Sequence, residues 1–271
     1  MRLLSGTELA GFIKERHAKQ AKALKNSGVR PKLAIVQVKD DPVINTYVRL
    51  KKQYGADVGI EVEVHTPSQA KTPELLKRLN DDKSVHGVIV QLPLADSSET
   101  EKIVNLVAPE KDVDALGKKA KFEPATPMAI MWLLSGYNID LSGKKILLIG
   151  RGKLVGAPLE KILTSSGFTV EVIERDVKDL KEHTQDADVI VTATGSPAVL
   201  YPEMIKQGAV VVDAGVASEE GKTVGDLSTE VYKRDDLTIT PKKGGVGPLT
   251  VCALFENVIR AASKGKSSKG K

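Results

Sequence analysis

Helix and strand signals alternate along this chain from one end to the other, and this alternation limits the folds open to it. Apolar runs of strand length are spread along both halves of the sequence, with segments of helical periodicity between most of them. The runs are 33–38, 60–64, 87–92, 145–149, 170–173, 189–192, 210–213 and 238–240. Strand–helix–strand repetition predicts parallel sheets with right-handed crossovers, so the expected fold class is α/β.

Several helix starts carry capping signals. Asp41 followed by proline predicts the start of a helix that Gly59 ends. The segments 5–8 and 98–101 both have the pattern of a capping box, which predicts a helix to about residue 25 and another over 103–107. Further helices are expected from 72, over 128–135 and 157–163, and at 249–262.

The length of 271 residues favours two domains. Aromatic residues make up only 4% of the chain, so the cores are expected to consist of Val, Ile, Leu and Ala. Residues 111–125 are charged and irregular, and the helix–strand pattern restarts after them. We therefore expect an N-terminal parallel-sheet α/β domain at 1–123 and a second domain at 124–248, with the last helix folding back on the first domain.

Charge and cysteine content exclude some partners. Four lysines of the formal net charge of +5 lie in the 264–271 tail, which leaves +1 for the remainder and gives little reason to expect nucleic-acid binding. The single cysteine, Cys252, is expected to pack inside a helix rather than act as a nucleophile. No apolar run is long enough to span a membrane and no signal-peptide pattern occurs, so we expect a cytoplasmic protein without a membrane partner.

A glycine-rich turn follows the strand at 145–149. Gly150, Gly152 and Gly156 form a GxGxxxG pattern that opens a helix, with the acidic Glu174 about 24 residues further on, at the end of the next strand. Glycines allow a tight turn and close backbone approach, and a helix N-terminus offers free N–H groups to a pyrophosphate. A glycine-rich strand–helix turn without a ligand is the alternative, but the context favours a Rossmann-like dinucleotide-binding domain.

Three more turns are expected at the same cofactor or near it. The segments 192–195 (TATG) and 213–215 (DAG) end two strands, and ligands of parallel sheets bind beyond the carboxyl ends of the strands. The segment 244–248 (GGVGP) is a further glycine-rich turn that leads into a helix.

The first domain carries polar residues that suit a site. Tyr47 and Lys51 are four residues apart on an expected helix and hence share a face; a half-buried tyrosine beside a solvated lysine is the plain alternative. The same spacing is typical of short-chain dehydrogenases, but there the glycine loop comes first. Gln91 ends an apolar strand, and Asp114 lies in a loop whose carboxylates could equally form a solvated turn.

Taken together, these segments resemble one family, the bifunctional methylenetetrahydrofolate dehydrogenase/methenyltetrahydrofolate cyclohydrolases. The matching motifs occur in the family's order over nearly the whole chain. They are DPVINTYVRLKK (41–52), GVIVQLPL (87–94), PEKDVDALG (109–117), PATP (124–127), GRGKLVGAPL (150–159), TATG (192–195), VDAG (212–215), GDL (225–227) and GGVGPLT (244–250).

The resemblance implies a function in one-carbon metabolism and purine biosynthesis. The enzyme would oxidise 5,10-methylenetetrahydrofolate with a nicotinamide cofactor and hydrolyse the methenyl product to 10-formyltetrahydrofolate, without a metal. It also implies a homodimer and a folate-binding cleft between the domains. Lys51 would be the key catalytic residue, tuned by Gln91, with Tyr47 against the aminobenzoyl ring and Asp114 on the pterin.

Further residues are implied at the two ligands. Folate contacts are expected from Leu92, Pro93, Gly244, Gly245 and Pro248. Cofactor contacts are expected from Gly150, Arg151, Gly152, Val155, Gly156, Arg175, Thr192, Ala193, Thr194, Gly195, Gly215 and Val216. Arg151 and Arg175 favour NADP and Glu174 favours NAD, so NADP is expected with NAD as the alternative.

The chain departs from the family pattern in places. Ile44 replaces a serine, Gly152 replaces the serine of the family's GRS motif, Ala115 replaces the glycine of KDVDG, and Lys242-Lys243 replace Val-Pro. The segment 114–124 is shorter than the family's by roughly nine residues, which puts the balance of the two activities in question. The rival interpretations are a shikimate-type dehydrogenase and a cofactor-sensing module without activity.

Overall fold

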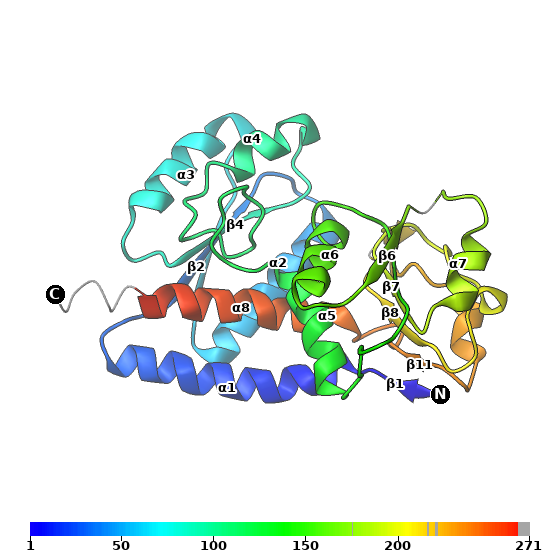
Figure 1. Cartoon of the computed structure of the whole chain (residues 1–271). Helices are drawn as coiled ribbons and strands as arrows, with labels where there is room; N and C mark the ends of the chain where they lie inside the picture. The colour runs from blue at the N-terminus through cyan, green and yellow to red at the C-terminus, as the bar shows by residue number, and fades with distance from the viewer. Residues whose placement is uncertain (175, 216, 220–221, 265–271) are drawn as a thin grey trace. The chain divides into compact units, whose positions relative to one another are not determined.

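The structure, a computed structural model, describes residues 1–174, 176–215, 217–219 and 222–264 (Figure 1). The chain divides into two compact units, each described by itself below. Unit 1 comprises Met1–Ala10 and Thr126–Thr250, and unit 2 comprises Gly11–Ala125 and the chain from Val251 onward. The sequence analysis assigned residues 1–10 to the first domain. They belong to unit 1 instead, because strand β1 (Arg2–Leu3) pairs with strand β11 (Thr238–Ile239) of that unit.

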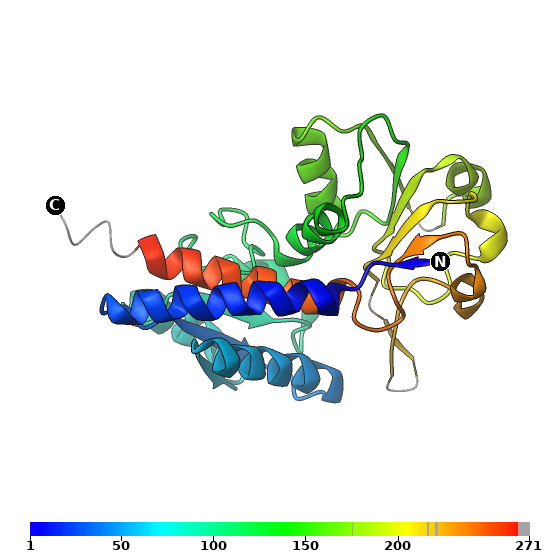
Figure 2. The same cartoon turned by 90° about the horizontal axis from the view of Figure 1, so that it is seen from below.

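Unit 2 contains a parallel three-stranded sheet of order β3-β2-β4. Its strands are β2 (Lys32–Gln37), β3 (Glu61–His65) and β4 (Gly87–Gln91). The helices that lie within it are α2 (Pro42–Val58), α3 (Thr72–Asp81) and α4 (Thr100–Val104), with 3₁₀ turns η1 (Gln69–Lys71) and η2 (Ser97–Glu99). Most of α1 (Gly6–Asn26) and of α8 (Val246–Lys264) also belongs to this unit, where the two helices lie side by side (Figure 2).

Unit 1 contains a six-stranded parallel sheet of order β1-β11-β8-β7-β5-β6. Its other strands are β5 (Ile146–Ile149), β6 (Val170–Ile173), β7 (Val189–Thr192) and β8 (Val210–Asp213). The helices are α5 (Ala125–Gly136), α6 (Gly156–Ser165) and α7 (Leu180–Asp186), and the 3₁₀ turns are η3 (Pro202–Met204) and η4 (Thr229–Lys233). A separate antiparallel hairpin joins β9 (Ala217–Glu219) and β10 (Lys222–Val224).

The cores have the composition that the sequence predicts. Aliphatic side chains of β2, β4, α3 and α4 form one buried cluster in unit 2, and those of β5, β7, β8 and β11 form another in unit 1. Burial on both faces is typical of parallel strands. Cys252 is fully buried in α8, as expected of a packing residue.

One expected cap was wrong. Ser98 does not open the helix near residue 103, because Asp96 accepts the N–H of Ser98 and starts the 3₁₀ turn η2 instead. The helix α4 follows directly, without a side-chain cap. The α/β class itself is confirmed.

Candidate active site

Helix α2 holds its lysine against the end of strand β4. The carboxylate of Asp41 accepts the N–H groups of Val43 and Ile44 at the start of α2, and Gly59 ends the helix in the left-handed conformation. Within this helix, Lys51 donates a hydrogen bond of 2.7 Å from Nζ to Oε1 of Gln91. The chain thus brings together two residues that are 40 positions apart and that the sequence analysis assigned to one site.

Asp114 adds a charge to this pair. Burial lowers the pKa of the Lys51 ammonium, and the negative charge of Asp114 opposes that shift. Burial likewise raises the pKa of the Asp114 carboxyl, and the charge of Lys51 opposes it. A lysine with a depressed pKa is suited to exchange protons with a bound substrate.

The carboxylate of Asp112 closes the loop that carries Asp114. It accepts the N–H of Gly117 at 2.7 Å and that of Leu116 at 3.3 Å. Burial, together with the charge of Asp114, raises the pKa of Asp112 to about 6. Ala115 directly follows Asp114 and has φ of 57°, a conformation that favours glycine. The hydrogen bonds of Asp112 therefore hold a turn in which Ala115 has a left-handed backbone conformation that alanine disfavours.

The rest of the short 114–124 segment is also anchored. The backbone N–H of Lys118 donates to the side chain of Asn105, and that of Lys121 donates to the carbonyl of Pro109. The side-chain amide of Asn257, on α8, donates to the carbonyls of Val113 and Glu123 at 2.9 Å each. These bonds hold both ends of the segment.

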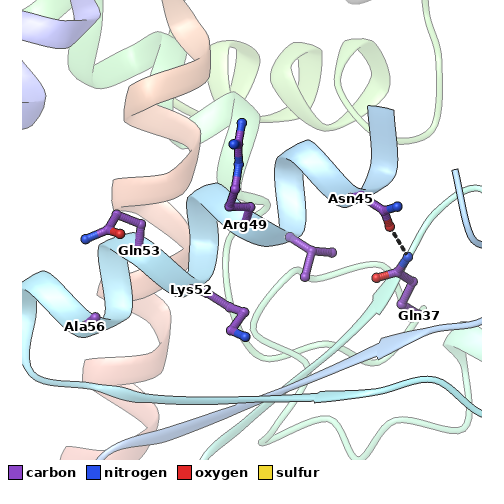
Figure 3. A pocket seen from close by; sticks show the side chains of 7 residues that line it. Gln37, Asn45, Arg49, Lys52, Gln53 and Ala56 are labelled. Atoms are coloured by element: carbon purple, nitrogen blue, oxygen red, sulfur yellow. Dashed lines mark hydrogen bonds between the residues drawn. The ribbon is translucent and has the colours of Figure 1, made fainter. Parts of the chain in front are cut away.

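Lys52, one residue further along α2, lies elsewhere. It lines an open hollow of about 450 Å³ on the flank of the helix, together with Arg49 and Gln37 (Figure 3). The Gln37 amide at the hollow's rim donates to Asn45 at 2.7 Å. Consecutive residues of a helix point about 100° apart, so Lys51 and Lys52 serve different surfaces.

The other folate residues expected in unit 2 lie on the same two elements. Tyr47 is half-buried on α2, one turn before Lys51. Leu92 and Pro93 follow β4 and are joined by a cis peptide bond, and the carbonyl of Leu92 accepts the side-chain amide of Gln91. A direct contact of Tyr47 with folate stays a prediction.

Gly244, Gly245 and Pro248, also expected at the folate, belong to unit 1. The carbonyl of Gly244 accepts the N–H of Thr7, and a Cβ on Gly6 would lie 1.8 Å from the carbonyl oxygen of Gly245. These glycines therefore form a close backbone contact at the start of α1, and their role at the folate stays a prediction.

The glycine loop of unit 1 requires two of its three glycines. Gly150 has φ of 95°, and a Cβ there would lie 2.7 Å from the carbonyl oxygen of Ala193. A Cβ on Gly156 would lie 2.0 Å from the carbonyl oxygen of Gly150. A side chain on Gly152 would meet no heavy atom within 4 Å, so its departure from the family pattern is tolerated.

The turns expected to bind the cofactor share one edge of the six-stranded sheet. Strands β5, β7 and β8 are adjacent and parallel, so the turns that begin at Gly150, Ala193 and Ala214 leave the sheet at its carboxyl edge. The remaining described cofactor residues lie in or next to these turns: Val155, Thr192, Thr194, Gly195 and Gly215. Ligands of doubly wound sheets bind at this edge.

Arg151, in the glycine loop, is paired with a carboxylate of the helix that follows the loop. Its guanidinium donates to the carboxylate of Glu160 on α6 at 2.7 and 3.2 Å. This pairing raises the pKa of Arg151, with a smaller contribution from Glu174. The arginine therefore lies near the acidic residue that was expected at the ribose. Arg175 and Val216, the other predicted cofactor residues, lie outside the described residues.

The described residues contain no group of three or more His, Cys, Asp or Glu side chains that could hold a metal ion. No helix in the same part of the chain is long and apolar enough to cross a membrane.

One unit has a parallel sheet with a glycine loop, and the other has a half-buried lysine beside an amide and a carboxylate. Together they define a class, the two-unit α/β enzymes that use a nicotinamide dinucleotide. Comparison with known families narrows this class. Residues 4–114 match the catalytic-domain model of tetrahydrofolate dehydrogenase/cyclohydrolase, and residues 124–266 match the NAD(P)-binding domain of the same family. The chain belongs to the tetrahydrofolate dehydrogenase/cyclohydrolase family.

Individual relatives agree with this assignment over nearly the full length. The bifunctional protein FolD of Francisella philomiragia is 38% identical, over 97% of this chain and 99% of its own. The structure of the bifunctional FolD of Campylobacter jejuni is similar with a TM-score of 0.91 at 37% identity, covering 98% of this chain and 99% of that one. The Trypanosoma brucei enzyme, solved with NADP and an inhibitor, has a TM-score of 0.91 at 28% identity and covers 97% and 98%. The predicted bifunctional enzyme is confirmed, and neither rival interpretation is favoured.

Two aspartates that hold turns were missed, Asp112 in unit 2 and Asp226 in unit 1. Asp112 was assigned only to a loop that could equally be a solvated turn, and Asp226 appeared only within the GDL motif. The signal that could have found both is an aspartate a few residues from a glycine in an irregular segment, a pattern in which carboxylates often accept backbone N–H groups.

Proposed function

We propose that this chain oxidises 5,10-methylenetetrahydrofolate with NADP and then hydrolyses 5,10-methenyltetrahydrofolate to 10-formyltetrahydrofolate, with Lys51 moving the protons of the hydrolysis. The observation that carries the proposal is the 2.7 Å hydrogen bond between Lys51 and Gln91, close to the charge of Asp114. The hydrogen bond fixes the direction of the amine, and burial lowers its pKa.

For the oxidation, the chain has to bind and orient. A bound nicotinamide would supply the acceptor for the hydride of the folate's methylene carbon. Asp114 holds the pterin and Tyr47 packs on the aminobenzoyl ring, so that the reacting carbon is presented in one orientation. Positioning of this kind supplies a large part of the rate of a two-substrate reaction.

For the hydrolysis, the chain has to move protons. Water adds to the methenyl carbon and loses a proton, which leaves a hydroxyl adduct. The bond from this carbon to N5 then breaks as N5 takes up a proton and the hydroxyl releases its own proton to solvent, which leaves the formyl group on N10. Neutral Lys51 accepts the first proton and, as the ammonium, returns one to N5. The Gln91 oxygen accepts a hydrogen bond from Nζ and so fixes the direction in which the amine points.

The choice of NADP rests on Arg151. Its guanidinium lies at the first turn of the glycine loop, where it would pair with the 2′-phosphate in bidentate fashion after leaving Glu160. Glu174 at the end of β6 favours a free ribose and hence NAD. Two cationic candidates, Arg151 and Arg175, outnumber this single carboxylate.

The proposal includes a homodimer that acts in the cytoplasm. The support for the dimer is the family resemblance. The support for the compartment is that the chain contains a single cysteine, too few for an internal disulfide.

The test is turnover of 5,10-methylenetetrahydrofolate with NADP and, separately, with NAD, followed by absorbance of the reduced cofactor and of the methenyl product. We expect turnover with both, and a higher kcat/KM with NADP. A kcat/KM that favours NAD would overturn the cofactor choice, and absence of turnover with either would overturn the function.

A further inference from the structure

Two aspartates of unit 1, one half-buried and one fully buried, form a network that the proposed reaction does not use directly. Asp213 ends strand β8, and Asp226 lies just beyond the β9–β10 hairpin. Asp226 is fully buried. Burial raises the pKa of both carboxyls, and in Asp213 the charge of Asp226 adds to this shift.

The carboxylate of Asp226 holds the turn after β7. One oxygen accepts the backbone N–H of Thr194 at 2.7 Å, and the other accepts that of Ser196 at 3.1 Å. Two backbone donors of this turn are therefore occupied by the protein itself. The turn must contact a ligand through its carbonyls, its side chains and its remaining surface.

The carboxylate of Asp213 holds the turn after its own strand and anchors Asp226. It accepts the backbone N–H groups of Gly215 and Asp226 at 3.0 Å each, and that of Leu227 at 3.3 Å. It also accepts the hydroxyl of Thr192 at 3.3 Å, at the end of β7. The two aspartates thereby link the ends of both strands.

Two glycines make this arrangement reciprocal. A Cβ on Gly215 would lie 1.9 Å from a carboxylate oxygen of Asp226, and a Cβ on Gly225 would lie 2.0 Å from one of Asp213. Gly215 lies two residues after Asp213 and leaves space for Asp226. Gly225 lies one residue before Asp226 and leaves space for Asp213. The VDAG and GDL motifs thus have one shared physical purpose.

We propose that Asp213 and Asp226 are positioning residues for the nicotinamide half of the cofactor, because they fix the turns after β7 and β8 against each other. The proposal rests on the proposed function, because it needs a nicotinamide cofactor bound at these turns, which lie at the carboxyl edge of the sheet. The adenosine half would depend instead on the glycine loop after β5 and on Arg151. Loss of one carboxylate should therefore weaken binding of only one half of the cofactor.

The test is Asp226→Asn. The amide keeps one oxygen but presents an NH₂ group to the second backbone N–H, and two donors cannot pair. We expect the Kd for NADP to rise roughly tenfold or more, because the turn loses its position. The Kd for 2′,5′-ADP, which lacks the nicotinamide half, should stay within about twofold of wild type, since the glycine loop keeps its contacts. Hydrolysis of added methenyltetrahydrofolate, which needs no cofactor, should be unchanged.

The matched control is Asp188→Asn. Asp188 also accepts a backbone N–H, that of Lys145 at 3.0 Å, and pairs with Lys206, but it precedes β7 at the opposite edge of the same sheet. This variant should bind NADP and 2′,5′-ADP as wild type does. If Asp226→Asn does not fold by circular dichroism, Asp213→Asn takes the same measurements.

Three outcomes would contradict an assignment, and they differ. An unchanged NADP affinity in a folded Asp226→Asn would overturn the positioning role. Equal losses for NADP and 2′,5′-ADP would also overturn it and indicate general damage to the unit. Failure of the wild-type protein to bind either NADP or NAD would instead overturn the proposed function.

Discussion

Lys51 donates a 2.7 Å hydrogen bond to Gln91 while Lys52, its neighbour in the same helix, lines a separate hollow on the flank of that helix. The geometry of α2 thus separates two chemically identical side chains. Half-buried Lys51 has a lowered pKa, and its partners are the amide oxygen of Gln91 and the charge of Asp114. This difference underlies the predictions for the hydrolysis.

Asp114 sets the pH dependence of that lysine. Its negative charge raises the pKa of Lys51 against the effect of burial, so its removal lowers that pKa further. In Asp114→Asn, neutral Lys51 is present at lower pH, and the rising limb of the hydrolysis rate should move to lower pH. The measurement is kcat for methenyl hydrolysis against pH at saturating substrate, with KM expected to rise and cofactor affinity to stay unchanged. A rising limb of the pH–rate profile at the wild-type pH would contradict the electrostatic coupling of Asp114 to Lys51.

Asp112 makes the stability of the fold depend on pH, with higher stability at low pH. Its pKa is raised from 3.8 to about 6 in the folded chain, so between these values the folded state binds more protons than the unfolded state. Stability from this group is present below pH 4 and lost as pH rises through 6, by about 3 kcal/mol. In Asp112→Asn, this fall in the free energy of unfolding between pH 4 and 6 should disappear. Urea unfolding at intervals across this range is the check, and an unaltered slope would refute the assignment.

Ala115 is expected to cost stability where it stands. Its φ of 57° is in the left-handed region, which costs a residue with a Cβ roughly 1 kcal/mol or more. Ala115→Gly should therefore raise the free energy of unfolding by about 1 kcal/mol. The control is Ala23→Gly on the exposed side of α1, which should lower it by a similar amount. Destabilisation by both substitutions would show that the left-handed turn is not strained.

The short 114–124 segment predicts an imbalance between the two activities. A segment about nine residues shorter than the family's would cover less of the bound folate, leave Lys51 more hydrated and so reduce the depression of its pKa. Hydride transfer depends mainly on holding two rings face to face and should suffer less. We expect methenyltetrahydrofolate to accumulate during turnover. The measurement compares the absorbance of the methenyl intermediate with the amount of 10-formyl product over time. Formyl product without any methenyl build-up would show that the length of the segment has no effect.

Local physical rules made most of the fold predictable. The start of α2 at Asp41 follows from a side-chain cap and its end at Gly59 from a left-handed glycine. Both ends were predicted from the sequence at these residues. The requirement for Gly150 and Gly156 likewise follows from the strand–turn–helix pattern. Signals of this kind act over a few residues and can be read without knowing the rest of the chain.

What could not be predicted depends on contacts between distant segments. The two residues of β1 carry no strand signal of their own and become a strand only because β11 offers an open edge. Asp226 accepts the N–H of Thr194, which is 32 positions away in the sequence. No local pattern predicts which distant backbone N–H a carboxylate will accept. For the active site, the family resemblance selected Lys51 and Gln91, whereas spacing alone left the plain alternatives open.

The most direct test of the account compares Lys51→Met with Lys52→Met in the hydrolysis of 5,10-methenyltetrahydrofolate. Both substitutions remove one ammonium group from α2 and keep a side chain of similar length, but only Lys51 contacts Gln91. We predict that Lys51→Met, folded as judged by circular dichroism, loses the hydrolysis by at least about a hundredfold. Lys52→Met should keep near-normal rates. Near-normal hydrolysis by folded Lys51→Met would contradict the central claim.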